Sequence, residues 1–285
     1  MIAATIKDGE IAPAEQPRPE AGAGELLVRV RAAGLNGADI LQRVGAYPPP
    51  PGYPVDIPGL EFAGEVVEVG EGARRFNRGD RIMTITGGGG QAEFATVHEA
   101  VAMPVPDSVD WPAAGGFAEA FLTAHDAIFG QCALRPGEHL LVNGAAGGVG
   151  TAAIQLGKLT GAIVTASVRD ESKHEAVAAL GADSVLLPDE VAEGGPYDVV
   201  LELVGGPNID PALRALETGG RICVIGVGAG FKAEVNLLTL MGKRAILRGS
   251  TLRARPLAEK ATVSHAVERE VLPALAAGEI VVPIV

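Results

Sequence analysis

Two different hydrophobic patterns divide the chain. Up to about residue 116, short segments alternate apolar and polar residues and are bounded by Gly, Pro or Asp. Such alternation predicts half-buried antiparallel strands, which together form a partly open β-barrel. The expected strands cover residues 25–31, 64–70, 80–86 and 92–97.

From about residue 117, apolar runs of four to six residues alternate with helix-length segments. This rhythm predicts βαβ units, and hence an α/β fold with a doubly wound parallel sheet of the Rossmann type covered by helices on both faces. The expected helices, residues 151–160 and 171–180, each end at a glycine. The expected strands are residues 139–143, 162–167, 184–187, 198–202, 221–225 and 245–249.

A small-residue turn joins the first strand of this second region to its first helix. Its glycine spacing is a variant of GxGxxG, and the order strand, turn, helix is what a dinucleotide pyrophosphate requires at a helix N-terminus. We therefore expect a nicotinamide dinucleotide here. The turn consists of Gly144, Ala145, Ala146, Gly147, Gly148, Val149 and Gly150.

The end of the next strand favours NADPH over NADH. The strand runs out through Ser167 to Arg169, and Lys173 follows in the first turn of the next helix. Both cations can face a 2′-phosphate, whereas Asp170 comes a little late to bind the ribose hydroxyls. The alternative is that Arg169 and Lys173 are a solvated surface pair.

Charge and cysteine content narrow the class of protein. The formal net charge of −12 and the pI near 4.9 oppose binding to nucleic acids or anionic membranes. No apolar run reaches the length of a membrane span, and the N-terminus reads as a strand and not as a signal peptide, so we expect a cytoplasmic protein. Cys132 and Cys223 are too few and too far apart for a disulfide framework or a cysteine-rich zinc site.

Five segments in order along the chain resemble one family. They are residues 32–39, 42–51, 58–64, 144–150 and 249–253. The chain resembles the zinc-independent quinone oxidoreductases of the medium-chain dehydrogenase/reductase superfamily, closest to the branch that includes the p53-inducible quinone oxidoreductase. The resemblance implies a GroES-like catalytic domain, a Rossmann domain that binds NADPH, a homodimer, and reduction of quinones or other activated enones.

The same resemblance sets the domain boundaries that we expect. Residues 1–116 are the GroES-like domain, residues 117–250 the cofactor domain, and residues 251–285 return to the first domain. Family chains continue beyond this point with a strand, a helix and a closing strand, so we expect the catalytic domain to be truncated.

Two positions depart from the zinc-dependent alcohol dehydrogenases of the superfamily. Where those enzymes have a cysteine and a histidine as zinc ligands, this chain has Asn36 and Leu60, followed by Glu61. An amide and an alkyl side chain cannot replace thiolate and imidazole, so we expect no metal. Glu61 then more plausibly makes a structural hydrogen bond than takes part in catalysis.

The resemblance also assigns residues to the reaction site. Asn36 is expected on the nicotinamide ribose side and Tyr47 near the substrate. Tyr47 can equally be a rigid support beneath the proline-rich loop that it begins, residues 47–52. Thr123 can reach the ribose or only pack its helix. Strand-end residues expected near the nicotinamide, with plain turn formation as the alternative for the glycines, are Gly205, Gly226, Gly228, Ser250 and Thr251.

These observations lead to one hypothesis and two alternatives. The hypothesis is an NADPH:quinone oxidoreductase that transfers hydride directly to a quinone or enone without zinc. The first alternative is an enoyl-thioester reductase of the same superfamily, although no basic stripe suggests an acyl-carrier site. The second is a cofactor-binding protein with a structural or regulatory role.

Overall fold

A computed structural model describes residues 1–284, which divide into two compact units. Among the described residues, the first unit comprises residues 1–122 and 252–284, and the second comprises residues 123–251. Helix α3 (Ala118–His125) crosses from the first unit to the second. Among the described residues, no helix combines the length and apolar character that a membrane crossing needs.

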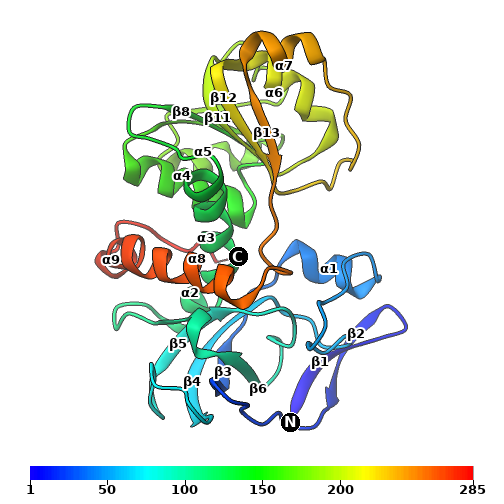
Figure 1. Ribbon diagram of the computed structural model, residues 1–285, viewed down its shortest axis with the longest axis vertical. Coiled ribbons are helices and arrows are strands. Elements are labelled where there is room, and N and C mark those ends of the chain that lie inside the picture. The colour runs from blue at the N-terminus through cyan, green and yellow to red at the C-terminus, as the bar shows by residue number, and fades with distance from the viewer. Residues whose placement is uncertain (285) are drawn as a thin grey trace. The chain divides into compact units, whose positions relative to one another are not determined.

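The first unit is built on a curled antiparallel sheet of five strands in the order β6-β3-β4-β5-β7 (Figure 1). Alternation along β3 and β6 places Leu26, Val28, Ala95 and Val97 on the buried face, where they pack with Phe62. The strands are β3 (Glu25–Ala32), β4 (Glu61–Val69), β5 (Arg81–Ile85), β6 (Phe94–His98) and β7 (Ala102–Pro104).

A separate hairpin lies at the N-terminus of this unit. Strands β1 (Ile2–Lys7) and β2 (Glu10–Glu15) pair antiparallel, with Lys7 opposite Glu10. The two turn residues, Asp8 and Gly9, have φ of 54° and 78°. An Asp-Gly pair accepts such positive φ values readily, which explains the tight turn. The sequence predicted a strand at the N-terminus but not its partner β2.

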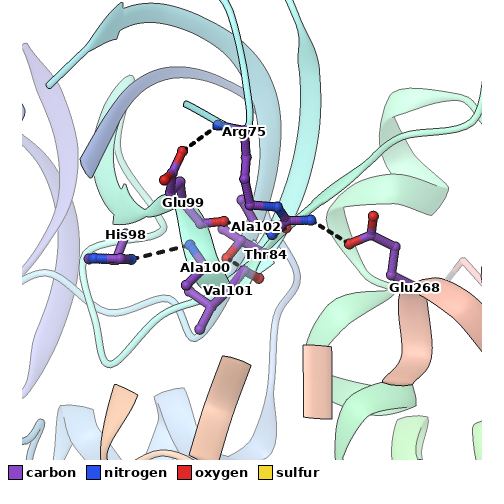
Figure 2. A network of polar contacts seen from close by, with 8 residues as sticks. All are labelled: Arg75, Thr84, His98, Glu99, Ala100, Val101, Ala102 and Glu268. Atoms are coloured by element: carbon purple, nitrogen blue, oxygen red, sulfur yellow. Dashed lines mark hydrogen bonds and ion pairs between the residues drawn. The ribbon is translucent and has the colours of Figure 1, made fainter. Parts of the chain in front are cut away.

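Short helices cover the first unit. The C-terminal helix α8 packs against the 3-10 turn at residues 99–101 and against β7. Arg75 joins these elements: its guanidinium donates to the carbonyls of Glu99 and Ala102 and pairs with Glu268 of α8 at 2.7 Å (Figure 2). The helices are α1 (Gly37–Arg43), α2 (Trp111–Gly115), α8 (Leu257–Glu270) and α9 (Leu272–Ala277).

The second unit contains a parallel sheet of six strands in the order β10-β9-β8-β11-β12-β13. Helices α4 and α5 pack on the β8–β9–β10 half, and α6 and α7 on the β11–β12 half (Figure 1). The strands are β8 (His139–Asn143), β9 (Ile163–Ser167), β10 (Ser184–Leu186), β11 (Tyr197–Glu202), β12 (Leu216–Val224) and β13 (Ile246–Gly249). The α-helices are α4 (Gly148–Thr160), α5 (His174–Ala179), α6 (Ile209–Ala215) and α7 (Leu237–Lys243).

The predicted fold class is confirmed, and the deviations are local. Strand β12 begins at Leu216, five residues before the expected residue 221. Leu216 already pairs with Tyr197 of β11, and the pairing becomes regular only from Arg221 onward. The expected helix at residues 171–180 is a 3-10 turn, residues 171–173, followed by α5. Asp170 caps this turn through its side chain, which explains the tighter start.

Candidate active site

The glycine turn of the second unit is held by the backbone of the neighbouring strand. Gly144, with φ of 78°, directly follows β8. The N–H groups of Gly144 and Ala145 both donate to the carbonyl oxygen of Ser167 at 3.2 Å. Ser167, the last residue of β9, thus lies beside the turn.

Gly150 allows α4 to start directly above the turn. A β-carbon at this position would lie 2.6 Å from the Cα and the carbonyl oxygen of Ala145, so any side chain would push the helix away. Gly147, the N-cap residue, and Gly148, the first helical residue, are exposed. The first amides of a helix lack intrahelical partners, so this thirteen-residue helix presents free donors suited to a pyrophosphate.

Two exposed cations follow β9. Neither Arg169 nor Lys173 forms an ion pair with a described residue. Asp170 is committed to its own turn, since its carboxylate accepts from the backbone N–H and the hydroxyl of Ser172 at 3.1 and 2.6 Å. These bonds, with smaller help from Lys173 and Arg169, lower the pKa of Asp170 below its usual value. The two cations are therefore available to an anionic ligand.

A buried acid that the sequence reasoning missed organises the neighbouring strand end. Glu202, at the end of β11, accepts from Asn143 Nδ2 at 2.7 Å and from the backbone N–H groups of Val204 and Gly205 at 2.6 and 2.8 Å. These bonds hold Gly205 at φ 119°, a conformation that favours glycine. An acidic residue directly after the buried run Val199–Leu201 was the available signal.

The glycines after β11 and β12 differ in their surroundings. A β-carbon on Gly205 would lie 2.6 Å from the carbonyl oxygen of Gly230, and one on Gly226 would lie 2.2 Å from that of Leu203. Close packing of the two loops therefore accounts for both glycines without a ligand. Gly228 is exposed, and a β-carbon there would meet no atom within 4 Å.

The remaining residues expected at the site of the second unit lie at or next to its first and last residues, where the chain passes from and to the first unit. Thr123 is half-buried on α3, and Thr251 is exposed after β13. Ser250 donates its hydroxyl to Asp126 at 2.9 Å, and its backbone N–H bonds to Val224. The hydroxyl hydrogen of Ser250 is therefore committed to Asp126.

In the first unit, Asn36 forms a network with two glutamates. Asn36 Nδ2 donates to Glu61 Oε1 at 2.9 Å, and the backbone N–H of Glu119 donates to Glu61 Oε2 at 2.9 Å. Glu61 is only 2% exposed. It makes the structural hydrogen bonds that the sequence suggested, and it fixes the orientation of the Asn36 amide.

The carboxyl groups around Asn36 are harder to ionise than usual. Burial raises the pKa of Glu61 to about 7, although its hydrogen bonds to Asn36 and Glu119 lower it. Burial, and then the nearby charges of Glu61 and Asp39, raise the pKa of Glu119 to about 8. Burial also raises the pKa of Asp39. Glu61 and Glu119 therefore retain protons near neutral pH.

Two further residues that the sequence reasoning missed shape this part of the site. Asp39 is buried and accepts from the backbone N–H groups of Asn36 and Gly59 at 2.8 and 2.9 Å, which fixes the start of α1. Buried Arg253 lies with its guanidinium carbon 4.8 Å from the centre of the Tyr47 ring. It donates to the Tyr47 carbonyl at 2.9 Å and also to Gln42.

Helix α1 thus links the two residues expected to be catalytic. Asn36 is its N-cap, and Gln42 near its end binds the arginine that lies against Tyr47. The spacing of Asn36 and Asp39 is that of a capping box, which was the available signal for Asp39. No local pattern indicates the partners of Arg253, because its bond to Gln42 spans 211 residues.

The donors at the position of the superfamily's zinc ligands do not fit zinc. Leu60 is buried and has no donor atom, and the Asn36 amide already donates to Glu61. Within residues 1–284, no three His, Cys, Asp or Glu side chains are grouped so that they could hold a metal ion.

Two family models match the chain. The model described as "Alcohol dehydrogenase GroES-like domain" matches residues 22–107, and the model described as "Zinc-binding dehydrogenase" matches residues 148–269.

Individual relatives are similar over most of the chain. The "Synaptic vesicle membrane protein VAT-1 homolog" of Mus musculus is 35% identical over 80% of this chain and 55% of its own length. The "Quinone oxidoreductase" of Rattus norvegicus is 31% identical over 80% of this chain and 71% of its own. The chain spans only 55–57% of the length of the mouse, human and rat VAT-1 homologs.

The chain is also similar to solved structures over nearly its whole length. The quinone oxidoreductase from Thermus thermophilus, whose structure is described together with its complex with NADPH, is 33% identical, with a TM-score of 0.83. The match covers 99% of this chain and 89% of that one. The chain therefore belongs to the medium-chain dehydrogenase/reductase superfamily of oxidoreductases, with quinone oxidoreductases among its relatives.

Proposed function

We propose that the protein reduces quinones or other activated enones with NADPH, by direct hydride transfer and without zinc. One observation carries the proposal: the open amides at the start of α4 and the unpaired cations Arg169 and Lys173 follow adjacent parallel strands, β8 and β9. Parallel strands place these groups at one edge of the sheet, where a dinucleotide binds. The quinone oxidoreductase relatives support this choice.

The second unit would hold NADPH through the turn from Gly144 to Gly150 and through Arg169 and Lys173. When bound, NADPH supplies the hydride. Ser167 contributes its backbone by supporting the turn, and Ser250 and Thr251 are the proposed partners of the carboxamide. Gly205 and Gly226 shape the loops that border the cofactor.

The first unit would supply Asn36 and Tyr47. The Asn36 amide, oriented by Glu61, offers its carbonyl oxygen to a ribose hydroxyl. We propose that Tyr47 orients the reduced carbonyl, with its ring fixed by Arg253. No Lewis acid is required, because a quinone or enone delocalises the charge that develops on its oxygen.

A panel of electrophiles tests this function. We expect steady oxidation of NADPH by 9,10-phenanthrenequinone and 1,4-benzoquinone, and much slower oxidation by crotonyl-CoA. Preference for crotonyl-CoA would favour the enoyl-thioester alternative. Tight NADPH binding without oxidation by any of the three would favour a binding role. In Tyr47→Phe, a quinone reduction rate equal to that of wild type would remove the role of the hydroxyl.

We also propose that the protein is a homodimer that pairs through the second unit. Strand β13 ends the six-stranded sheet, and an edge strand offers unpaired backbone groups. Ile246 of this strand is 44% exposed, and on α7 Leu238 and Met241 are 79% and 70% exposed. A two-fold axis beside β13 would bury this apolar surface against its own copy.

A further inference from the structure

The first unit contains a cavity that none of the proposed catalytic residues lines. Its volume is about 670 Å³, within the usual range for small-molecule sites. Strand β6, the loop after Gly52, the N-terminal hairpin and α8 surround it. Its apolar side chains include Ile57, Ile85, Phe94, Val97, Val101 and Leu257. Polar side chains also line it, namely those of Gln16, Glu25, Asp56, Thr86, Thr96, His98 and Lys260.

One cation lines this apolar space without an anionic partner. Lys260 of α8 is only 8% exposed, and its side chain makes no hydrogen bond or ion pair with any residue from 1 to 284. Its ammonium lies 5.6 Å from the centre of the Tyr53 ring, which offsets only part of the cost of burial. A buried ammonium normally has a hydrogen-bonded counter-ion.

Each of the two acids that line the cavity accepts a hydrogen bond from a residue other than Lys260. The Glu25 carboxylate accepts from the backbone N–H of Gly22 at 2.9 Å, and the Asp56 carboxylate accepts from Gln16 Nε2 at 3.2 Å. Neither pairs with Lys260. The positive charge is therefore available to a ligand.

The helix that carries Lys260 is fixed in place. Arg75 bonds both to the carbonyls of Glu99 and Ala102 and to Glu268 on the same helix (Figure 2). Val101, which lines the cavity, belongs to the segment that Arg75 holds. The cavity wall and Lys260 are thus tied together, so the site is formed before a ligand arrives.

We propose that this cavity binds a small amphipathic monocarboxylate. Its carboxylate pairs with Lys260, and its hydrocarbon body lies against the apolar wall. A fully polar anion such as phosphate would leave that wall uncovered, and a neutral hydrocarbon would leave the ammonium unpaired. The site is independent of the proposed reductase activity.

Octanoate and 1-octanol are matched probes, because they share a chain and differ in charge. In calorimetric titrations of the whole protein we expect octanoate to bind more tightly than 1-octanol. Lys260→Met should weaken octanoate binding about 10- to 100-fold, as expected for a lost charge-assisted hydrogen bond, and leave 1-octanol binding unchanged. Lys260→Arg should keep octanoate binding, and Lys7→Met, at an exposed lysine of β1, should not affect it.

Isotope-labelled isoleucine methyl groups locate the bound probe. Octanoate should shift the methyl signals of Ile57 and Ile85 in the cavity and leave Ile154 and Ile222, buried in the second unit, unchanged. Equal affinity for octanoate and 1-octanol in wild type, or shifts confined to Ile154 and Ile222, would overturn the proposal. So would undiminished octanoate binding in folded Lys260→Met. If Lys260→Met does not fold, the proposal is still tested on wild type by the relative affinities for octanoate and 1-octanol and by the methyl signals that shift.

Discussion

The side-chain amide of Asn36 donates to the buried carboxyl group of Glu61 at 2.9 Å. The other carboxyl oxygen of Glu61 accepts from the backbone N–H of Glu119 at 2.9 Å. Burial raises the pKa of Glu61 to about 7. The acceptor that orients the Asn36 amide is therefore an acid that is hard to ionise.

The first prediction concerns stability against pH. The pKa of Glu61 is about 7 in the folded protein against 4.5 normally, and that of Glu119 is about 8. At pH values between the ordinary pKa of 4.5 and these raised values, the folded state binds more protons than the unfolded state. The free energy of unfolding should therefore fall as pH rises from about 5 to about 8. Glu61 alone contributes at most about 3 kcal/mol to this loss in the free energy of unfolding.

Urea unfolding at pH 5 and pH 8 measures this effect. In Glu61→Gln the difference between the two pH values should shrink, because the amide does not titrate. Glu10→Gln, at an exposed acid of β2, should leave the difference unchanged. A wild-type protein that is more stable at pH 8 would show that these acids are ionised in the fold.

The second prediction concerns the start of α4. Gly150→Ala places a methyl group 2.6 Å from the backbone of Ala145, so unfolding should become easier by about 1–3 kcal/mol. NADPH binding should weaken as well, because the first helical amides move. Gly242→Ala, in α7 where no atom lies within 4 Å, should instead stabilise by up to about 1 kcal/mol. Thermal unfolding with and without NADPH separates the two effects, and equal stability of both variants would contradict the packing argument.

The third prediction concerns the choice between NADPH and NADH. Removing either Arg169 or Lys173 should weaken NADPH binding about 10- to 100-fold and leave NADH binding nearly unchanged. Fluorescence titration of both cofactors against Arg169→Ala and Lys173→Ala measures this. Arg214→Ala, at an exposed arginine of α6, is the control. If wild type and variants bind both cofactors equally, the two cations do not face the phosphate.

The fourth prediction concerns assembly. Light scattering should give wild type twice the 29.0 kDa mass of one chain. Leu238→Asp should yield monomers, because the charge would be buried in the proposed interface. Val55→Asp, at a valine of the first unit that is 73% exposed, should remain dimeric. A dimeric Leu238→Asp protein would place the interface elsewhere, and a monomeric wild type would exclude the dimer at that concentration.

How far the sequence predicts the structure depends on how local the cause is. Strand β8 was predicted with its observed bounds because a buried parallel strand is a continuous apolar run, and the following turn has its own glycine pattern. The start of β12 was wrong, because the register of Leu216 with Tyr197 depends on the neighbouring strand. No pattern within residues 216–220 specifies that pairing.

The site follows the same rule. Ser167 was expected at the end of its strand, and the strand order of a βαβ unit brings it beside the turn. Arg253 was missed because its partners Gln42, Tyr47 and Gly87 come from distant segments. Glu202 was missed although an acid after an apolar run is visible in the sequence, because only the structure reveals its bond to Asn143.

A single-turnover experiment tests the central claim most directly. The protein is mixed with NADPH deuterated at one or the other C4 position and then with 9,10-phenanthrenequinone, and the loss of the reduced nicotinamide is followed. Direct hydride transfer predicts rapid oxidation that is slowed by deuterium at only one of the two positions, with NADH much less effective than NADPH at low concentration. Absence of oxidation, or a rate that neither deuterium position changes, would contradict hydride transfer from NADPH to a quinone.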